Sequence, residues 1–331
     1  MSKRSTVARL AAALVLLIGT SCLRAGGQQA GTPNGGVPCD HACLVKLVDQ
    51  YLAAMVKHDA AGLALAANVK FTENTATLPI GDGLWVGASE APTTFKIYAA
   101  DPTSHQVAFY GLMKEFDKPI LLALRLKVED GKITEIEHVV VREVRDSALP
   151  NLTTPRPGLV ETIPPAERSP REKMVRIANS YFEAIEHSDG SLAPFADDCA
   201  RRENGLQTTT NKTPQAGPVG GPNGPMAIVS TRGCRANIDT HILSYITNIR
   251  PRRLIVVDEE RGIVFGFPMF NHRGAVRTVK IVGVPGVDSM PMTGATSTLQ
   301  AAEIFGIRNG QIHEIEAIGY MLPCGSKTGW E

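Results

Sequence analysis

The sequence predicts an α+β protein built from two copies of one fold, and three observations support this. Each half of the chain begins with a helical stripe of apolar residues and ends in alternating segments typical of antiparallel strands. The two halves align without a gap over their first part, where Tyr51 matches Tyr181 and Asp59 matches Asp189, with residue numbers that differ by 130. Between the halves, residues 146–170 hold six prolines, a density typical of an extended linker.

The helical and strand patterns are clear in the first copy. Its helix is predicted from "VDQYLAAMVKHD", which continues a stripe formed by Leu44, Leu47, Val48, Tyr51 and Met55. Four later segments, "TTFKIYAAD", "HQVAFYGLMKE", "PILLALRLKVE" and "KITEIEHVVVRE", read as successive antiparallel strands. The turn "EDGK" at 129–132 is a hairpin signal, because Gly131 can take a positive φ.

Further matches extend the repeat through both copies. Asp101 in "AAD" matches Asp258 in "VVD", and "EDGKITEIEHVVV" matches "RNGQIHEIEAIGY". Several separated segments that recur in the same order indicate a duplicated fold. The last match pairs four glutamates that alternate with isoleucine, a pattern that predicts a solvent-facing side of a strand: Glu135, Glu137, Glu314 and Glu316.

The N-terminus has the pattern of a secretory signal peptide. Lys3 and Arg4 precede the apolar run "LAAALVLLIG" (residues 10–19), and small residues follow. We therefore expect an exported protein, periplasmic or extracellular, with lipid anchoring at Cys22 as an alternative to simple cleavage. No later hydrophobic run reaches spanning length, so we expect no integral membrane segment after signal removal.

These signals define the domain boundaries. We expect a signal peptide over 1–25 (cleavage extending to residue 30 as an alternative), a first domain over 39–146, a proline-rich linker over 147–170 and a second domain over 171–325, with a Gly/Pro-rich insertion at 205–225.

Export allows disulfides to form. The predicted bridge is Cys199–Cys234, because it closes a loop around the insertion. Cys39 and Cys43 are spaced to bridge each other, or one of them reaches Cys324. Although "CDHAC" contains a histidine, no second ligand cluster has zinc-like spacing, so we expect no metal.

Composition excludes some classes of function. The net charge is +1 and aromatic residues make up only 5% of the chain, so neither a basic nucleic-acid footprint nor a base-stacking platform is predicted. No glycine-rich phosphate loop, Ser-His-Asp order or paired metal carboxylates stand out, and we expect no cofactor.

The repeated motif carries a family resemblance. "GKITEIE" (131–137) and "GQIHEIE" (310–316) each close a copy that begins with helices, and this arrangement resembles the nuclear-transport-factor-2-like (SnoaL-like) cone fold. The whole chain also resembles a family of secreted bacterial and fungal proteins of unassigned function, through "CLVKLVDQYLAAMVKHD", "VKFTEN", "GDGLW", "ADP" and "DDCARREN". The resemblance implies two tandem cone-shaped domains, each a curved antiparallel sheet wrapped around N-terminal helices, with a largely apolar pocket inside.

Enzymes of this fold mostly move protons, with a carboxylate, histidine or tyrosine inside a dry cone, where burial brings a carboxyl pKa toward the working pH. The catalytic candidates are therefore Glu73 or His138 as the base and Asn74 as an amide that orients the substrate. The alternative is structural: the asparagine caps a turn, and the glutamate of each copy pairs with Arg125 or Arg202.

Other residues are candidates for the pocket wall. Trp85 in "GDGLW" is either a wall or lid of the pocket or a packed loop anchor. Arg125 alternates with leucines, and it either holds an acidic substrate or faces solvent. Tyr110 is a candidate hydrogen-bond donor. The remaining candidate binding residues are Tyr51, Glu203, Asn204 and His241.

The leading hypothesis is a cofactor-independent lyase, isomerase or dehydratase that acts on a small, partly apolar molecule in the first domain. A non-catalytic ligand-binding or scaffold protein is the alternative, and in a third reading one copy is active while the other keeps only the fold. A homodimer remains open. If Glu73 and His138 line one cavity, the enzyme is favoured, whereas an arginine locked onto Glu73 excludes that residue as a base.

Overall fold

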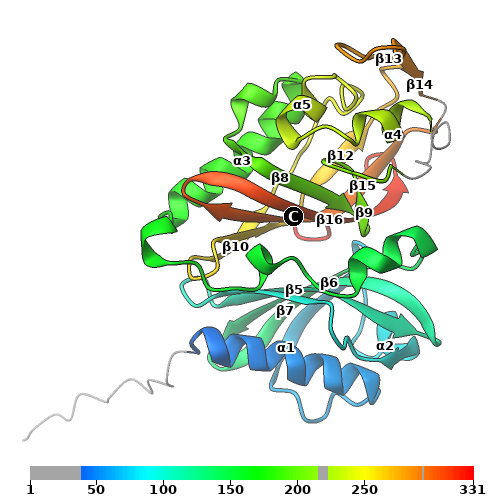
Figure 1. Ribbon diagram of the computed structural model, residues 1–331. Helices are drawn as coiled ribbons and strands as arrows, with labels where there is room; N and C mark the ends of the chain where they lie inside the picture. The colour runs from blue at the N-terminus through cyan, green and yellow to red at the C-terminus, as the bar shows by residue number, and fades with distance from the viewer. Residues whose placement is uncertain (1–38, 215–222, 293) are drawn as a thin grey trace, which may run out of the picture. The chain divides into compact units, whose positions relative to one another are not determined.

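Two large β-sheets, each with a long helix on one face, dominate the computed structural model (Figure 1), which describes residues 39–214, 223–292 and 294–331. The expected signal peptide, its cleavage sites and Cys22 lie outside the described residues, as does part of the predicted insertion at 205–225. Helices and mixed sheets confirm the predicted α+β class.

The two long helices lie at equivalent places in the two copies. Helix α1 (His41–Val56) begins at Asp40, whose side chain accepts a hydrogen bond from the backbone N–H of Cys43 at 2.9 Å, a standard N-cap. Helix α3 (Arg171–His187) begins directly after Pro170. Helix α1 buries its predicted stripe except for Leu47, which is partly buried, and α3 buries a matching stripe; Tyr51 and Tyr181 lie in the middle of these stripes.

The first sheet contains the four predicted strands and three more. Strands β4 (Lys96–Asp101), β5 (Gln106–Glu115), β6 (Lys118–Glu129) and β7 (Lys132–Val141) pair antiparallel in sequence, as predicted. The turn between β6 and β7 has Gly131 at a φ of 72°, also as predicted. The remaining elements are β1 (Leu65–Glu73), β2 (Ala76–Thr77), the short helix α2 (Leu84–Gly87) and β3 (Ala88–Glu90).

Strand β1, which ends at Glu73, runs parallel to the last strand of its copy, β7, and the sheet order is β2-β1-β7-β6-β5-β3 with β4 also on β5. The second copy repeats this arrangement: β8 (Phe195–Glu203) runs parallel to β16 (Gln311–Pro323). The second sheet has the order β10-β11-β15-β16-β8-β9, with β12 also on β15. Its other strands are β9 (Leu206–Gln207), β10 (Leu254–Asp258), β11 (Ile263–Gly266), β12 (Met269–His272) and β15 (Ser297–Arg308).

The second copy also carries elements that the first lacks. They are the short helices α4 (Pro225–Val229) and α5 (Cys234–Ile238), and a separate pair of strands, β13 (Thr278–Lys280) and β14 (Ser289–Pro291). A disulfide joins Cys199 in β8 to Cys234 at the start of α5, which confirms the predicted bridge. Of the two alternatives left open for Cys39 and Cys43, the structure has the bridge between them.

The proline-rich segment between the copies differs from an extended linker. It folds into three short 3-10 helices, η1 (Asp146–Leu152), η2 (Pro157–Leu159) and η3 (Pro165–Glu167). The apolar side chains of Ala148, Leu152 and Leu159 are buried in the hydrophobic cluster that the two sheets share. Proline density excluded a long helix but not short turns, in which proline is well tolerated at the first position.

Each sheet buries its other face against the other sheet. One hydrophobic cluster lies between α1 and the first sheet, a second lies between α3 and the second sheet, and a third joins the two sheets. The third cluster includes Ile97, Tyr110 and Val139 from the first copy and Phe265 and Ile304 from the second. Residues 37–331 therefore form one compact unit.

Two aspartates at matching positions cross between the copies. Asp101 accepts the backbone N–H of Val257 at 3.0 Å, and Asp258 accepts the backbone N–H of Ala100 at 3.0 Å. The residue that begins each long helix completes the pattern: Arg171 forms two hydrogen bonds of 2.7 and 2.6 Å to Asp101, and His41 contacts Asp258 at 2.8 Å. The matched aspartates of the repeat are thus reciprocal contacts between its copies.

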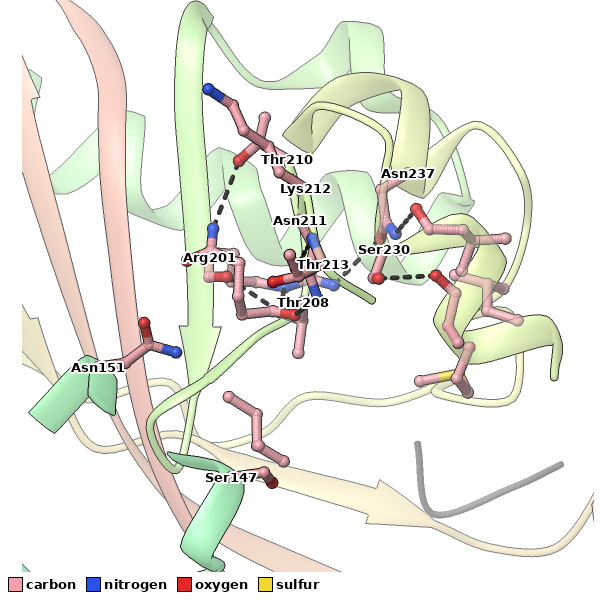
Figure 2. Close-up of a pocket in the computed structure, with 16 residues that line it drawn as sticks. Ser147, Asn151, Arg201, Thr208, Thr210, Asn211, Lys212, Thr213, Ser230 and Asn237 are labelled. Atoms are coloured by element: carbon pink, nitrogen blue, oxygen red, sulfur yellow. Dashed lines mark hydrogen bonds between the residues drawn. The ribbon is translucent and has the colours of Figure 1, made fainter. Parts of the chain in front are cut away.

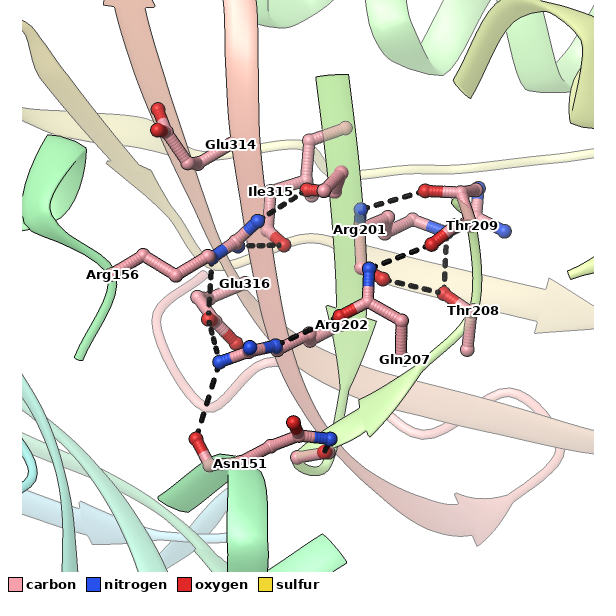
Figure 3. A network of polar contacts seen from close by, with 12 residues as sticks. Asn151, Arg156, Arg201, Arg202, Gln207, Thr208, Thr209, Glu314, Ile315 and Glu316 are labelled. Carbon is pink, nitrogen blue, oxygen red and sulfur yellow. Dashed lines mark hydrogen bonds and ion pairs between the residues drawn. The ribbon is translucent and has the colours of Figure 1, made fainter. Parts of the chain in front are cut away.

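The prediction that four glutamates face solvent is wrong for two of them. Glu137 and Glu316 are fully buried between the sheets. Glu137 accepts two hydrogen bonds from Arg253, and Arg156 donates to Glu316 at 3.1 Å (Figure 3). The alternation of glutamate with isoleucine correctly separated the two faces of each strand. The face that carries the glutamates is nevertheless buried, because the other sheet covers it.

Candidate functional site

The Glu-Asn pair that ends β1 forms a turn. Asn74 has a left-handed φ of 46°, a conformation that asparagine tolerates well. Its side chain donates to the carbonyl of Val140 at 3.0 Å and accepts the Val140 N–H at 2.8 Å, while its backbone N–H donates to the carbonyl of His138 at 3.0 Å. The amide side chain therefore continues the strand pairing beyond the end of β1.

The second pair repeats this geometry. Asn204 has a φ of 47°, and its side chain exchanges two hydrogen bonds with the backbone of Gly319, at 3.2 and 2.8 Å. Its backbone N–H donates to the carbonyl of Ala317 at 2.8 Å. The side-chain oxygen and nitrogen of both asparagines therefore form hydrogen bonds to the backbone. This agrees with the alternative in which the asparagine caps a turn, rather than with a catalytic role.

Glu73 is locked in place by cationic and backbone donors. One carboxylate oxygen accepts from Arg142 at 2.8 Å, and the other accepts from the backbone N–H of Leu84 at 2.7 Å. The preceding Gly83 has a φ of 64°, and a Cβ there would lie 2.6 Å from this carboxylate. Burial alone raises the pKa of Glu73, but interactions with His138, Arg142 and the Leu84 N–H outweigh it and lower the pKa to about 2. Such a carboxylate is a poor base at neutral pH.

Buried side chains fill the interior of the first copy. The Trp85 indole N–H donates to the Tyr51 hydroxyl at 2.9 Å, and this hydroxyl lies 2.9 Å from His138 Nε2. His138 Nδ1 lies 3.6 Å from Glu73, too far for a hydrogen bond. The Phe71 ring packs on the His138 ring with centroids 4.8 Å apart. Trp85 is thus a packed anchor, and the space expected for a substrate is occupied.

The remaining first-copy candidates lie elsewhere. Arg125 is buried rather than solvated; it donates to Glu137 at 2.9 Å and stacks on Trp330, with 4.6 Å between guanidinium carbon and ring centroid. Tyr110 belongs to the cluster between the sheets. In the second copy, His241 lies in a turn after α5 with a φ of 62°. None of these three lines either of the cavities described below.

The second copy has a cavity of about 210 Å³ on the side of the sheet that faces α3. Its walls are largely aromatic and aliphatic and include Tyr181, Tyr245 and Phe270. The polar side chains that line it include Glu303 and His272. The predicted binding candidates Glu203 and Asn204 also line it. This combination of an apolar wall with a few polar groups is typical of a small-molecule site.

Two exchanges of residues between the copies explain why this interior differs from the first. In the first copy, His138 on β7 pairs with Leu124 on β6. At the corresponding place in the second copy, Ala317 on β16 pairs with Glu303 on β15. The small alanine leaves volume where the histidine ring would lie, and the carboxyl group comes from the neighbouring strand instead.

The titratable groups of the cavity are desolvated. Glu303 is only 4% exposed, and its Oε2 has no hydrogen-bond partner among the described residues. Burial, reinforced by the charge of Glu203, raises the pKa of Glu303 well above its usual range. Burial also lowers the pKa of His272, whose Nε2 is buried without a partner. Both shifts favour the uncharged form of the group, a protonated carboxyl for Glu303 and a neutral imidazole for His272.

Neighbouring groups keep the rest of the cavity ordered. Glu203 pairs with Arg201 at 2.9 Å. Burial raises the pKa of Tyr245 to about 12, and its ring packs on His272 with centroids 5.3 Å apart. The two carboxyl groups of the cavity thus have unlike surroundings, one unpaired and one paired with an arginine, and such differences separate acid from base roles in many enzymes.

Sequence reasoning missed Glu303, His272 and Tyr181 as site residues. A usable signal was present for Glu303, because it is the one charged residue within "LQAAEIFGI" and matches Leu124 of the first copy. His272 gave no such signal: β11 and β12 together occupy the place that β5 has in the first copy, and His272 falls at the position of Glu115 at the end of that strand. No group of three or more potential metal ligands occurs among the described residues. Within the same residues, no helix is both long and apolar enough to cross a membrane.

Comparisons with known proteins add a family match. A family model described as a domain of unknown function (DUF8021) matches residues 167–319, the part of the chain that contains the cavity. No curated protein matches the chain. A crystal structure of a protein from Sphaerobacter thermophilus is similar to 30% of this chain and 96% of that chain, with 14% identity and a TM-score of 0.25. At this TM-score, fold and function have to be argued from the chain itself.

Proposed function

We propose that this protein is an exported, cofactor-independent lyase or isomerase whose working site is the cavity of the second copy. The two copies correspond to the tandem cone-shaped domains of the nuclear-transport-factor-2-like resemblance, one with a filled interior and one with an open interior. Export is supported by the two disulfides and by the signal-like N-terminal sequence. This assignment moves the active site from the first domain, where the sequence placed it, to the second.

One observation carries the proposal: Glu303 Oε2 and His272 Nε2 are buried atoms without a hydrogen-bond partner among the described residues, and both side chains line one largely apolar cavity. Buried polar groups without a partner cost stability, so they point to a role that a ligand completes. The neutral His272 is suited to remove a proton from carbon, and the protonated Glu303 is suited to donate one to the oxygen of an adjacent carbonyl. The products of this step are an enol, an imidazolium and a carboxylate. Return of the proton from the imidazolium to the α-carbon and of the enol O–H proton to the Glu303 carboxylate gives exchange; with a β,γ-unsaturated carbonyl compound, return of the proton to the γ-carbon of the dienol completes an isomerisation.

The test is exchange of carbon-bound protons in D₂O. The purified protein is mixed with small neutral ketones and aldehydes, and loss of α-proton signals is followed by proton NMR. Exchange is expected with the wild type, strongly reduced exchange with Glu303→Gln, and none with His272→Gln. His241→Gln is the matched control, because His241 lines neither cavity. Exchange that survives both cavity substitutions would exclude the proposed acid and base.

The alternative is a non-catalytic binding protein that uses the same cavity. It is favoured by the modest volume and the aromatic walls, which suit a small ligand without requiring a reaction. Perturbed resonances of cavity residues on addition of a ketone, with no proton exchange, would support this alternative over the enzyme.

A further inference from the structure

A second cavity, of about 310 Å³, also lies in the second copy and is drawn in Figure 2. It is bounded by β9, the segment that follows it, α4 and α5, with Ser147 and Asn151 of η1 at one edge. The side chains labelled in Figure 2 show its polar character: apart from two cations, they carry hydroxyl or amide groups. It shares no lining residue with the cavity of the proposed function.

The two cavities have opposite charge. The cavity of the proposed function is lined by two carboxyl side chains and no lysine or arginine. The second is lined by Arg201 and Lys212, and no aspartate or glutamate is among its lining residues. An ion pair divides them, because Arg201 lines the second cavity while its partner Glu203, 2.9 Å away, lines the first.

Arg201 is held rigidly at this wall. It is only 3% exposed, and it donates to Thr208 Oγ1 at 3.0 Å and to Asn237 Oδ1 at 3.0 Å. Both acceptors line the same cavity. Lys212 is exposed, and it has no ion-pair partner among the described residues. Because Arg201 is already paired with Glu203, the uncompensated charge at this cavity is that of Lys212 at the rim. The rim lysine and the fixed guanidinium together favour a carboxylate, since arginine forms strong charge-assisted hydrogen bonds to that group.

The rest of the lining narrows the class of ligand. Hydroxyl and amide groups such as those of Thr210 and Asn211 match hydroxyl groups of a ligand, and Met226 and Ile242 provide an apolar wall for its C–H face. We propose that this cavity is a binding site for a hydroxylated carboxylate of sugar-acid type. The carboxylate faces Arg201 and Lys212, and the hydroxyl groups bond the amide and hydroxyl side chains.

Calorimetric titration of the purified protein with glucuronate and with glucose tests the proposal. Glucuronate is expected to bind at least about tenfold more tightly than glucose, because it adds a charge-assisted hydrogen bond to a buried cation. Lys212→Gln is expected to weaken glucuronate binding roughly two- to fivefold and to leave glucose unchanged, as an exposed ion pair contributes little. Because Lys212 is exposed, this variant does not disturb the core.

Two controls locate the binding. Lys118→Gln removes an exposed lysine from the first copy, and Glu303→Gln alters only the other cavity; neither is expected to change glucuronate affinity. Equal affinity for the acid and the neutral sugar, no saturable binding of glucuronate, or indifference to Lys212→Gln would each overturn the proposal. Loss of glucuronate binding in Glu303→Gln would likewise overturn it. None of these binding results bears on proton exchange at the other cavity. Failure of the sugar-acid proposal can therefore be distinguished from failure of the proposed lyase or isomerase function.

Discussion

Replacing Glu303 by leucine should stabilise the protein, although Glu303 lies in the core. Its carboxyl group is buried with one oxygen unpaired, and the corresponding residue of the first copy is Leu124. Removing a buried, unsatisfied polar group recovers about 1–3 kcal/mol of unfolding free energy. For a chain of this size, that corresponds to a rise in melting temperature of roughly 2–6 °C.

The stability gained by Glu303→Leu should depend on pH. Because burial raises the pKa of Glu303, the folded protein holds this proton to a higher pH than the unfolded chain does. The associated stability is fully present below the unfolded pKa, and it is lost as pH rises toward the folded pKa. The advantage of Glu303→Leu over the wild type should therefore grow between about pH 4 and about pH 8.

Urea denaturation at both pH values is the assay, with two comparison variants. Glu303→Gln abolishes the titration but keeps a buried polar group, so it should flatten the pH dependence while gaining less stability than leucine. Glu143→Leu, at an exposed position, controls for the change of composition. The reasoning is wrong if Glu303→Leu is less stable than the wild type at about pH 8, or if its advantage is the same at both pH values, because Glu303 would then be ionised and paired.

Three further predictions follow from the same contacts. Glu73→Gln should lower the free energy of unfolding by about 1.5–3 kcal/mol at neutral pH, because it removes an acceptor of charge-assisted hydrogen bonds. The pKa of Glu73 in the folded wild type is about 2 against an ordinary 4.5, so this loss of stability should shrink as pH falls below 4.5. An undiminished loss in acid denaturation curves would contradict this. The double change Cys199→Ala and Cys234→Ala should cost roughly 2–4 kcal/mol, because the bridge closes a loop of 35 residues; an unchanged urea midpoint under non-reducing conditions would refute it. Ala317→His should place in the second copy the residue that fills the first, and it should abolish ligand-induced NMR shifts in that cavity while the fold persists; persistent shifts would show that the ring finds space elsewhere.

Much of the fold was predictable because periodicity and repetition are local signals. The helical stripe around Tyr51, the strands β4–β7 and the turn at Gly131 all depend on short-range patterns, and the structure contains each of them. The solvent-facing side expected for Glu137 failed for a non-local reason. Its alternation with isoleucine separates two faces, but only the packing of one sheet on the other decides that both faces are buried.

The candidate site was harder to predict because pairing register determines which side chains share a cavity. Glu73 and His138 lie close together, as the sequence suggested. The two donors to Glu73, Arg142 and the Leu84 N–H, come from segments whose positions the pattern does not reveal. The cavity depends on one small residue, Ala317, on a strand that otherwise resembles its first-copy match. Sequence similarity between the copies identifies the scaffold that they share. The differences between their interiors come from single substitutions, such as Ala317 in place of His138.

The reciprocal aspartate contacts suggest why the two copies are free to differ in their interiors. Asp101 and Asp258 hold the copies together through backbone groups and helix starts that both copies possess, so this interface depends on features that the repeat preserves. The interiors lie on the opposite faces of the sheets, each against its own helix. A substitution in one interior therefore makes no direct contact with the other interior. In the first copy Trp85, Tyr51 and His138 Nε2 are linked by hydrogen bonds, although His138 Nδ1 has no partner. In the second copy Glu303 Oε2 and His272 Nε2 both lack a partner among the described residues, a cost that the common core offsets.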